Sequence, residues 1–377
     1  MMKFDRFLEK IILDFLRPNK VNVIVGTRRV GKTYLIQKIS REASYKTLTL
    51  EGEDSTTQEL LAQKSIANYQ RILSGVELLV IDEAQAIPDI GKILKLIVDQ
   101  IPNIRIIVTG SSALDLSQKS GEPLTGRAYF HNLYPIAQEE LNQHENPVQI
   151  LSNLEERLVY GGYPELFQLN LIKERELYLK DLVTSYLLKD ILTYEGIRNA
   201  DKIKDLLRLI AYQVGKEVSM EELGKTLQIS KNTVEKYLDL LTKVFILRKV
   251  GGFSRNLRKE VTKTSRWYFH DNGIRNALIN DFRPLVLRTD VGELWENYLV
   301  SERLKYLHYA QRQPEFYFWR TYDQQEIDWL EYENGHLSAF EFKWTENQTK
   351  IPKAFSQAYP DATFQLINRG NYIGFIS

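Results

Sequence analysis

The stretch VNVIVGTRRVGKTYLIQKI, residues 21–39, decides the fold of the first third of this 377-residue chain. Its β-branched run leads into GTRRVGKT, which fits the pattern G-x-x-x-x-G-K-[ST]. Glycines at both ends of the loop permit positive φ and close backbone approach, so its amides can cradle phosphate at a helix N-terminus. We expect Lys32 to reach the β- and γ-phosphates and Thr33 to hold Mg²⁺; an ordinary glycine-rich turn is the alternative. The predicted ATP-binding residues are Gly26, Thr27, Arg28, Arg29, Val30, Gly31, Lys32 and Thr33.

Outward from this loop, short apolar runs alternate with amphipathic stretches. The runs cover 21–25, 46–50, 77–81 and 104–108, and helical patterns lie near 32–43, 58–73 and 89–100. Continuous apolar strands separated by helices indicate a parallel sheet covered on both faces. The expected fold class is therefore α/β.

LLVIDEAQ, residues 78–85, ends an apolar run with two carboxylates. In an open α/β sheet the carboxyl ends of the strands form the ligand edge. Asp82 is predicted to serve Mg²⁺ directly or through water, and Glu83 to polarise an attacking water, which makes ATP hydrolysis the expected reaction. The alternative is an acidic pair at a helix N-terminus.

Two further groups are candidates for the same reaction. Thr109, Ser111 and Ser112 follow the run at 104–108 and are candidate γ-phosphate sensors. Arg127 follows Gly126 and is predicted to supply transition-state charge in the same subunit or to a neighbour in a homo-oligomer. A surface ion pair is the alternative for Arg127.

Residues 219–243 have the pattern of a helix-turn-helix. Ser219 and Glu222 form a capping box, Ser230 precedes a second helix, and Val234, Leu238 and Leu241 recur at helical spacing. We expect DNA contact within residues 230–260, because a recognition helix exposes its first turn to DNA. A structural lid is the alternative. The basic residues of the following segment, a predicted wing, are Arg248, Lys249, Arg255, Arg258 and Lys259.

Asn334-Gly335 between alternating segments predicts a two-residue hairpin turn. If Glu333 pairs with His336, Asp328 lies opposite Glu341 and Glu326 opposite Lys343. Alternation then predicts a single apolar face made of Ile327, Trp329, Phe340 and Phe342. Facing carboxylates repel one another, and a divalent metal would reverse that repulsion. We therefore predict a metal-dependent nuclease arrangement with Asp328, Glu341 and Glu296 as ligands and Lys343 acting on bound water. A solvated strand face with a Glu326–Lys343 ion pair is the alternative.

The composition excludes several classes of site and protein. The chain has no cysteine, five scattered histidines and a formal net charge of +1, so disulfides, thiolate zinc sites and a global basic field are absent. Asp5, Glu9 and Asp14 interrupt the apolar N-terminal segment, which argues against a signal peptide. No apolar run reaches membrane-spanning length. We expect a cytoplasmic protein without membrane contact.

The order of these motifs resembles the bacterial and archaeal AAA-type P-loop ATPases fused to a C-terminal domain of unknown function. The resemblance rests on GTRRVGKT, LLVIDEAQ, TGSS, LTGR, GGYPE, YLLKDIL, the helix-turn-helix segment, YFHDNGI and ELWEN…EIDWL…AFEFKW. It implies a RecA/AAA-like sheet, a winged helix and a PD-(D/E)XK nuclease-like fold. Asp328, Glu341 and Lys343 match the nuclease motif, and Glu296 matches its helical Glu. The sensor strand lacks the family's Asn and no second-sensor arginine is evident, so strong ring-type hydrolysis is not implied.

The predicted domains are an ATPase core at 1–135, a helical lid at 136–200, a winged helix at 201–280 and a nuclease-like domain at 285–377. A GGYP break at 161–164 resembles a hinge. The first functional hypothesis is an ATP-driven DNA-processing enzyme. The second is a nucleotide-dependent switch or scaffold whose C-terminal fold is catalytically inactive. The predicted catalytic residues are Lys32, Glu83, Arg127 and Lys343.

Overall fold

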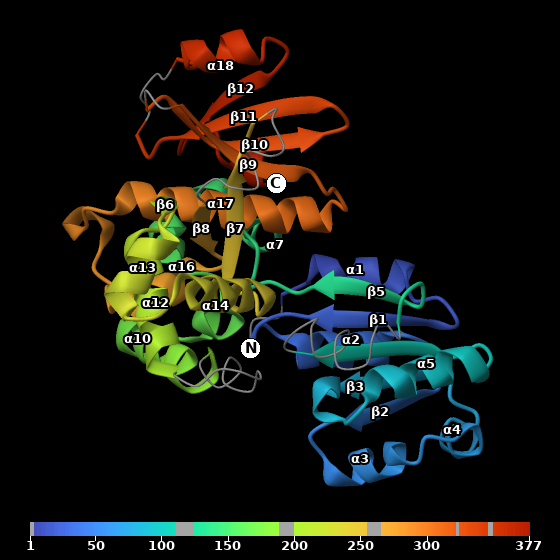
Figure 1. The fold of residues 1–377 in the computed structure, drawn as a ribbon. Coiled ribbons are helices and arrows are strands. Elements are labelled where there is room, and N and C mark those ends of the chain that lie inside the picture. The colour runs from blue at the N-terminus through green and yellow to red at the C-terminus, as the bar shows by residue number, and fades with distance from the viewer. Residues whose placement is uncertain (1–3, 111–123, 188–199, 255–264, 322–323, 346–349) are drawn as a thin grey trace. The chain divides into compact units, whose positions relative to one another are not determined.

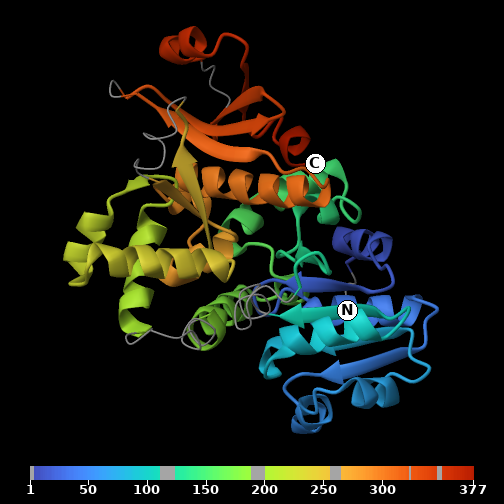
Figure 2. The same cartoon turned by 45° about the vertical axis from the view of Figure 1, so that its right-hand side comes forward.

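A computed structural model describes residues 4–110, 124–187, 200–254, 265–321, 324–345 and 350–377. The chain divides into two compact units (Figures 1 and 2). Unit 1 runs to Tyr134 and includes Lys243–Phe245; unit 2 contains Pro135–Thr242 and Ile246–Ser377. Ser111, Ser112 and the wing residues Arg255, Arg258 and Lys259 lie outside the described residues.

Unit 1 contains a five-stranded parallel sheet with the order β2-β3-β4-β1-β5. This arrangement confirms the α/β prediction for the first third of the chain. β4 lies between β1, which leads into the phosphate loop, and β3, which ends in the acidic pair. The strands are β1 (Lys20–Val25), β2 (Thr47–Glu51), β3 (Leu78–Asp82), β4 (Arg105–Gly110) and β5 (Ala128–Asn132).

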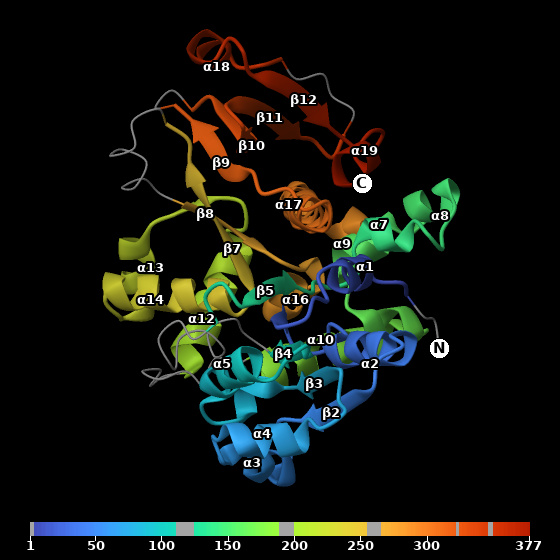
Figure 3. The ribbon, with the colours of Figure 1, turned by 90° about the vertical axis from the view of Figure 1, so that its right-hand side faces the viewer.

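Helices cover both faces of this sheet, and Figure 3 shows α2 and α5 on opposite sides of it. Val21, Val23 and Val25 alternate towards the face where Ile93 and Ile97 of α5 are buried. Burying each such side chain stabilises the unit by about 1.5–3 kcal/mol. The helices are α1 (Phe7–Asp14), α2 (Lys32–Glu42), α3 (Ser55–Ala62), α4 (Ile66–Ile72), the 3₁₀ turn η1 (Ala84–Ala86) and α5 (Ile90–Gln100).

Unit 2 begins with helices and continues into a seven-stranded mixed sheet with the order β12-β11-β10-β9-β7-β8-β6. α17 packs against β8 and β11, and it runs along the sheet in Figure 2. The strands are β6 (Glu217–Val218), β7 (Leu247–Gly252), β8 (Ser265–Phe269), β9 (Glu315–Arg320), β10 (Glu326–Glu333), β11 (His336–Phe342) and β12 (Thr363–Ile367).

Its helices include the long buried α17 and several short segments. They are α7 (Gln138–Leu141), α8 (Pro147–Ser152), α9 (Leu154–Tyr160), η2 (Pro164–Gln168), α10 (Ile172–Asp181), the π-helix η3 (Leu182–Leu187), α12 (Ala200–Tyr212), α13 (Met220–Leu227), α14 (Lys231–Lys243), α16 (Asn272–Ile279), η4 (Leu285–Leu287), α17 (Val291–Tyr309), α18 (Lys353–Ala358) and α19 (Ile373–Ile376). No helix in the described ranges combines the length and apolar character that crossing a membrane requires.

The helix pair α13 and α14 forms as predicted. The Ser219 hydroxyl accepts a hydrogen bond from the Glu222 amide at 3.3 Å, and the Ser230 hydroxyl accepts one from the Thr233 amide at 3.1 Å. The predicted stripe Val234, Leu238 and Leu241 is buried. β7 and β8 follow as an antiparallel pair, and β7 also pairs with β9 in parallel. One sheet therefore joins the strands that follow α13 and α14 to the C-terminal strands.

The hairpin of β10 and β11 has the predicted register, with Glu333 paired to His336 and Trp329 to Phe340. Asn334 and Gly335 have φ of 53° and 84°, as a tight turn with two left-handed residues requires. The predicted single apolar face is wrong in detail. Ile327 packs with Phe355 of α18, whereas Phe340 contacts Phe375, 4.8 Å between ring centroids. An irregularity in the β9 pairing between residues 327 and 330 accounts for the change of face.

The GGYP break is held in place by α16 and does not have the free surroundings of a hinge. The Gly162 amide donates to Asp271 Oδ2 at 2.7 Å, and the Ile274 amide donates to Asp271 Oδ1 at 3.1 Å. Gly161 has φ of 78°, and a Cβ there would overlap the Asp271 carboxylate. Asp271 therefore caps α16 and fixes the glycine pair at the same time.

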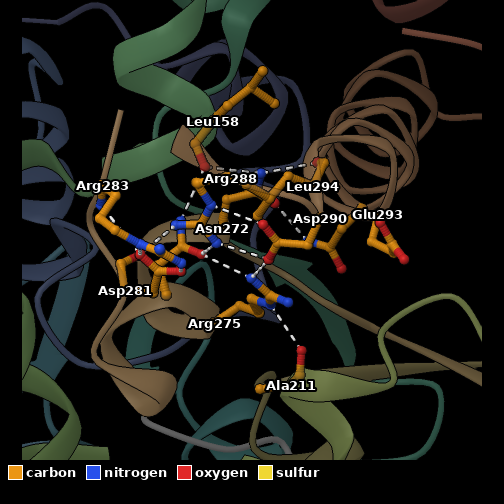
Figure 4. Close-up of polar contacts among 12 residues, drawn as sticks. Leu158, Ala211, Asn272, Arg275, Asp281, Arg283, Arg288, Asp290, Glu293 and Leu294 are labelled. Atoms are coloured by element: carbon orange, nitrogen blue, oxygen red, sulfur yellow. Dashed lines mark hydrogen bonds and ion pairs between the residues drawn. The ribbon is translucent and has the colours of Figure 1, made fainter. Parts of the chain in front are cut away.

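A buried polar network surrounds α16 and adds to the hydrogen bonds of Asp271 (Figure 4). The Asn272 amide donates to the Leu158 carbonyl at 3.2 Å and to the Leu294 carbonyl at 3.0 Å, which ties α9 and α17 to α16. Arg275 and Arg288 both pair with Asp290. Because buried polar groups are costly when unpaired, this network specifies one arrangement of the helices.

Candidate nucleotide site and C-terminal carboxylate cluster

The phosphate loop lies between the carboxyl end of β1 and the first residue of α2. A Cβ at Gly26 would overlap the Leu133 carbonyl oxygen, and Gly31 has φ of 99°. Both positions therefore require glycine, and Arg29 also has a left-handed φ of 66°. The loop has the tight backbone that brings consecutive amides towards an anion.

Lys32 spans this loop from the start of α2. Its ammonium donates to the carbonyl of Gly26 at 3.0 Å and to that of Thr27 at 3.2 Å, and only 4% of the residue is exposed. The same nitrogen lies 3.9 Å from Glu83 Oε1. The cation is therefore held at the mouth of the loop, where a polyphosphate chain would meet it.

Thr33, Asp82 and Thr109 form a chain of hydrogen bonds across the strand ends. The Thr33 hydroxyl donates to Asp82 Oδ2 at 2.6 Å, and the Thr109 hydroxyl donates to Asp82 Oδ1. The Thr109 hydroxyl also accepts from the Glu83 amide at 2.9 Å. Hydroxyl and carboxylate oxygens are ligands that Mg²⁺ prefers, so the pair Thr33 and Asp82 fits this ion.

Glu83 occupies a strained position at the end of β3, with φ of 46°. Non-glycine residues rarely adopt such a conformation, and those that do are concentrated at functional sites. Gln85 donates to Glu83 Oε2 at 2.5 Å, and the other oxygen faces Lys32. The side chain is 21% exposed, which leaves it accessible to water.

Two residues near this site were not found from the sequence. Burial raises the pKa of Glu51, and the charges of Asp82 and Glu83 add to the effect. The acidic end of the run at 46–50 was the available signal for Glu51. Arg6 donates to the Val30 carbonyl at 2.9 Å and to the Tyr134 carbonyl at 2.6 Å, which supports the loop from behind. No local pattern links Arg6 to a loop some twenty positions away.

Arg127 is not brought to the phosphate loop of its own chain. It precedes the amino end of β5, where its carbonyl accepts from the Val21 amide at the start of β1. Its guanidinium pairs with Asp99 at 2.7 Å and 3.0 Å. The loop lies at the opposite ends of these parallel strands, so the ion-pair alternative describes Arg127 here. A role in a neighbouring subunit stays a prediction.

The predicted C-terminal residues do meet in space, and each is already engaged. Tyr268 donates to Glu296 Oε1 at 2.7 Å, the Phe342 amide donates to Asp328 Oδ2 at 2.9 Å, and Lys343 donates to Glu341 Oε1 at 2.6 Å. Burial raises the pKa of Glu296 to about 8 and that of Glu341 to about 7, and the charge of Asp328 adds to both shifts.

A cation from β8, missed by the sequence reasoning, completes this cluster. Arg266 donates to Glu326 at 2.9 Å and lies 3.7 Å from both Glu296 and Asp328. In the part of the chain that the structure describes, no three Asp, Glu or His side chains are grouped to hold a metal ion. The predicted ligand set Glu296, Asp328 and Glu341 is therefore present but not arranged around a metal position. The signal available was an arginine inside the otherwise apolar run SRWYF.

The first two turns of α14 expose Lys231, Asn232 and Lys236. Lys231 pairs with Glu221 of α13 at 2.6 Å. Of the predicted wing cations in the described ranges, Lys249 is exposed, whereas Arg248 is half-buried over the Phe316 ring. Lys231 and Lys236 of α14 are therefore more exposed than Arg248 of the predicted wing.

Three protein families match successive parts of the chain. Residues 18–142 match the AAA domain, residues 151–284 a domain of unknown function (DUF8612), and residues 291–373 another domain of unknown function (DUF4143).

Two relatives that align with most of this chain are described as uncharacterized proteins. An uncharacterized protein of Mycobacterium tuberculosis is 27% identical over 347 residues, which cover 90% of this chain and 74% of that protein. An uncharacterized protein of Methanocaldococcus jannaschii is 24% identical over 375 residues, which cover 94% and 82%.

Among solved structures, the Walker-type ATPase of Pyrococcus abyssi has a TM-score of 0.50 with 17% identity, covering 74% of this chain and 96% of that one. This likeness concerns the fold. Together with the AAA match and the glycine loop, it identifies a P-loop ATPase-like domain in residues 18–142 and supports ATP binding there.

Proposed function

We propose that the protein binds ATP with Mg²⁺ at residues 26–33 and hydrolyses it with Glu83 as the group that activates water. The observation that carries this proposal is the chain linking Thr33, Asp82, Thr109 and Glu83 beside Lys32. An ordinary acidic helix start would not require a threonine hydroxyl bonded to both Asp82 and the Glu83 amide.

Each side chain has a distinct task in this reaction. When ATP binds, the Lys32 ammonium donates its hydrogen bonds to phosphate oxygens in place of the loop carbonyls that accept them in this structure. Thr33 and Asp82 hold Mg²⁺, which neutralises charge on the phosphates when bound. Glu83 accepts a hydrogen bond from the attacking water, and its carboxylate is aligned by Gln85. The amides of the loop stabilise charge that develops on the β-phosphate.

The test is ATP turnover of the wild type and of Glu83→Gln, with nucleotide binding measured separately. Glu83→Gln keeps shape and size, so ATP should still bind while turnover falls by about 10²–10⁴-fold, the usual contribution of general base catalysis. Unchanged turnover in this variant would remove Glu83 from the mechanism. Loss of ATP binding would show that Glu83 has a structural role instead.

A second candidate function is DNA contact through α13 and α14. It is favoured by the exposed Lys231, Asn232 and Lys236 on the first two turns of α14, and by an order of helices and strands from α12 to β8 that resembles a winged helix. Because the net charge is only +1, such contact depends on this local surface.

DNA should accelerate ATP turnover, and salt should suppress that acceleration because phosphate contacts release counterions. Lys231→Ala combined with Lys236→Ala should reduce the effect, whereas Lys173→Ala, an exposed lysine on α10, serves as the matched control. If the double variant and the Lys173→Ala control lose the acceleration equally, the effect of DNA is a nonspecific response to charge. If DNA does not change ATP turnover of the wild type, that result counts against DNA coupling.

For the C-terminal strands we favour the switch or scaffold hypothesis over DNA cleavage. The carboxylates are paired with protein donors and with Arg266. Plasmid nicking with Mg²⁺ or Mn²⁺ that disappears in Asp328→Ala would restore the nuclease hypothesis. We place the ATPase in the cytoplasm, where its substrate is available.

A further inference from the structure

Carboxylates from three elements converge beside β8. Glu296 comes from α17, Glu326 and Asp328 from β10, and Glu341 from β11. Glu296, Asp328 and Glu341 are largely buried, and Glu341 Oε2 has no hydrogen-bond partner in the described part of the chain. Ionised carboxylates repel one another strongly in a low-dielectric environment, so a nearby cation stabilises this cluster wherever the carboxylates are not protonated.

Arg266 supplies that cation from within the fold. The residue is 4% exposed, and its guanidinium lies over the Phe318 ring, 4.6 Å from the ring centroid. One nitrogen donates to Glu326, and the other lies 3.7 Å from Glu296 and from Asp328. Neighbouring residues of β8 pair with β6 and β7, so backbone bonds on both sides position this arginine.

A divalent ion and this guanidinium compete for the same oxygens. Mg²⁺ and Ca²⁺ require ligand oxygens at about 2.0–2.6 Å, with most of the shell supplied by carboxylates and water. A guanidinium within hydrogen-bonding or ion-pairing reach of three of the carboxylates fills part of that volume and repels a second cation. The oxygens already bound by Tyr268, Lys343 and the Phe342 amide are further withdrawn from metal binding.

We propose that Arg266 is the resident cation of this cluster and closes it to divalent metals, so that removing the arginine would open a metal site that the wild type lacks. The metal expected from the nuclease-like resemblance therefore does not fit the residues present. The inference is independent of ATP hydrolysis at residues 26–33, because it concerns only side chains of unit 2.

Mn²⁺ binding without nucleotide, followed by electron paramagnetic resonance, tests the proposal. The wild type and Glu341→Gln should bind Mn²⁺ equally weakly. Arg266→Gln should gain one site with affinity at least about tenfold higher, an effect of roughly 1.4 kcal/mol. The gain should disappear in Arg266→Gln combined with Glu341→Gln. Arg266→Lys keeps the positive charge and should stay closed.

Two measurements keep the result interpretable. ATP turnover of Arg266→Gln should equal that of the wild type, which reports that unit 1 is intact, and circular dichroism reports the fold of the whole chain. If Arg266→Gln does not fold, the wild type and Glu341→Gln decide: tight Mn²⁺ binding by the wild type that Glu341→Gln abolishes would overturn the proposal. Equal weak binding by the two proteins supports it.

Discussion

At the scale of single residues, the site depends on one buried hydroxyl. Thr109 is fully buried, donates to Asp82 and accepts from the Glu83 amide. It therefore fixes both the predicted Mg²⁺ ligand and the backbone of Glu83, the residue proposed to activate water. Of the three sensor candidates in the sequence, Thr109 is the one that the structure describes, and its contacts are those of a positioning residue.

Thr109→Val keeps the shape of the side chain and removes the hydroxyl. We expect ATP turnover to fall by about 10–100-fold, because Asp82 Oδ1 and the Glu83 amide each lose one hydrogen bond and keep only the 3.1 Å bond between them, at a cost of about 1–3 kcal/mol. ATP affinity should change less than turnover, since the loop itself is untouched. Steady-state kinetics with fluorescent nucleotide binding makes the comparison. Thr109→Ser restores the hydroxyl and should recover activity; a serine variant as slow as the valine variant would contradict this role.

At the scale of elements, the GGYP and YFHDNGI stretches form one rigid contact between the glycine pair and the start of α16, which we call the joint. Asp271 bonds the Gly162 amide while capping α16, and a Cβ at Gly273 would overlap the Tyr160 carbonyl. The sequence alone suggests a hinge at the glycines. The structure instead uses them because two backbones and a carboxylate approach closely there.

Gly161→Ala should lower the free energy of unfolding of unit 2 by more than about 2 kcal/mol. The reason is the left-handed φ of 78° combined with the overlap of a new methyl group and the Asp271 carboxylate. Chemical denaturation measures the change. Gly292→Ala is the matched control, because a Cβ on α17 there meets nothing within 4 Å. A similar loss in both variants would show that the joint carries no special strain.

The same joint predicts a dependence of stability on pH. Burial raises the pKa of Asp271 to about 6, although Lys305 and the amides of residues 162, 273 and 274 oppose this shift. The folded state therefore holds the proton more tightly than the unfolded state. The resulting stability is present below about pH 4 and is lost as the pH rises through 6, by roughly 3 kcal/mol in total.

Asp271→Asn isolates this contribution, since it keeps the cap and cannot ionise. The free energy of unfolding of the wild type minus that of the variant should decrease between pH 4 and pH 7. Urea titrations at each pH give this difference, and a constant offset from the lost Gly162 bond does not alter its slope. A difference that is flat, or that increases with pH, would contradict the raised pKa.

At the scale of the whole molecule, local patterns predicted much of the fold. The strands around the phosphate loop, the helix pair at 219–243 and the register of the hairpin at Asn334 follow from alternation, capping and turn chemistry. These signals lie within a few residues of one another. The apolar face of β10 was predicted less well, because the irregular pairing with β9 depends on another part of the chain.

The sites were predictable only where a contiguous motif defines them. Lys32 and Thr33 belong to such a motif, and Asp82 with Glu83 follows a strand whose end is predictable. Arg266 enters the carboxylate cluster from a strand sixty positions before Glu326, and no spacing rule joins them. Arg127 illustrates the reverse case: a flexible glycine beside it does not reveal at which end of the sheet it lies.

The division into two units predicts a localised response to nucleotide. At 100 times its dissociation constant, Mg²⁺·ATP should stabilise the unit that binds it by about 2.7 kcal/mol. Hydrogen exchange should therefore slow in β1, α2 and β3, whereas β10 and β11 serve as an internal reference. Lys32→Ala should abolish the protection, because Lys32 is the proposed phosphate-binding cation. Protection that persists in this variant would place the nucleotide elsewhere.

The parallel pairing of β7 with β9 has a practical consequence for expressing parts of this chain as separate proteins. Gly251 pairs with Tyr317 and Gly252 with Phe318, so the sheet crosses the gap between the two matched domains of unknown function. A protein truncated after residue 284 lacks β9, so β7 becomes an exposed edge strand. Unpaired edge strands can pair with other chains and cause aggregation. Expression of either domain by itself should yield aggregates, and the working unit for biochemistry is the fused pair.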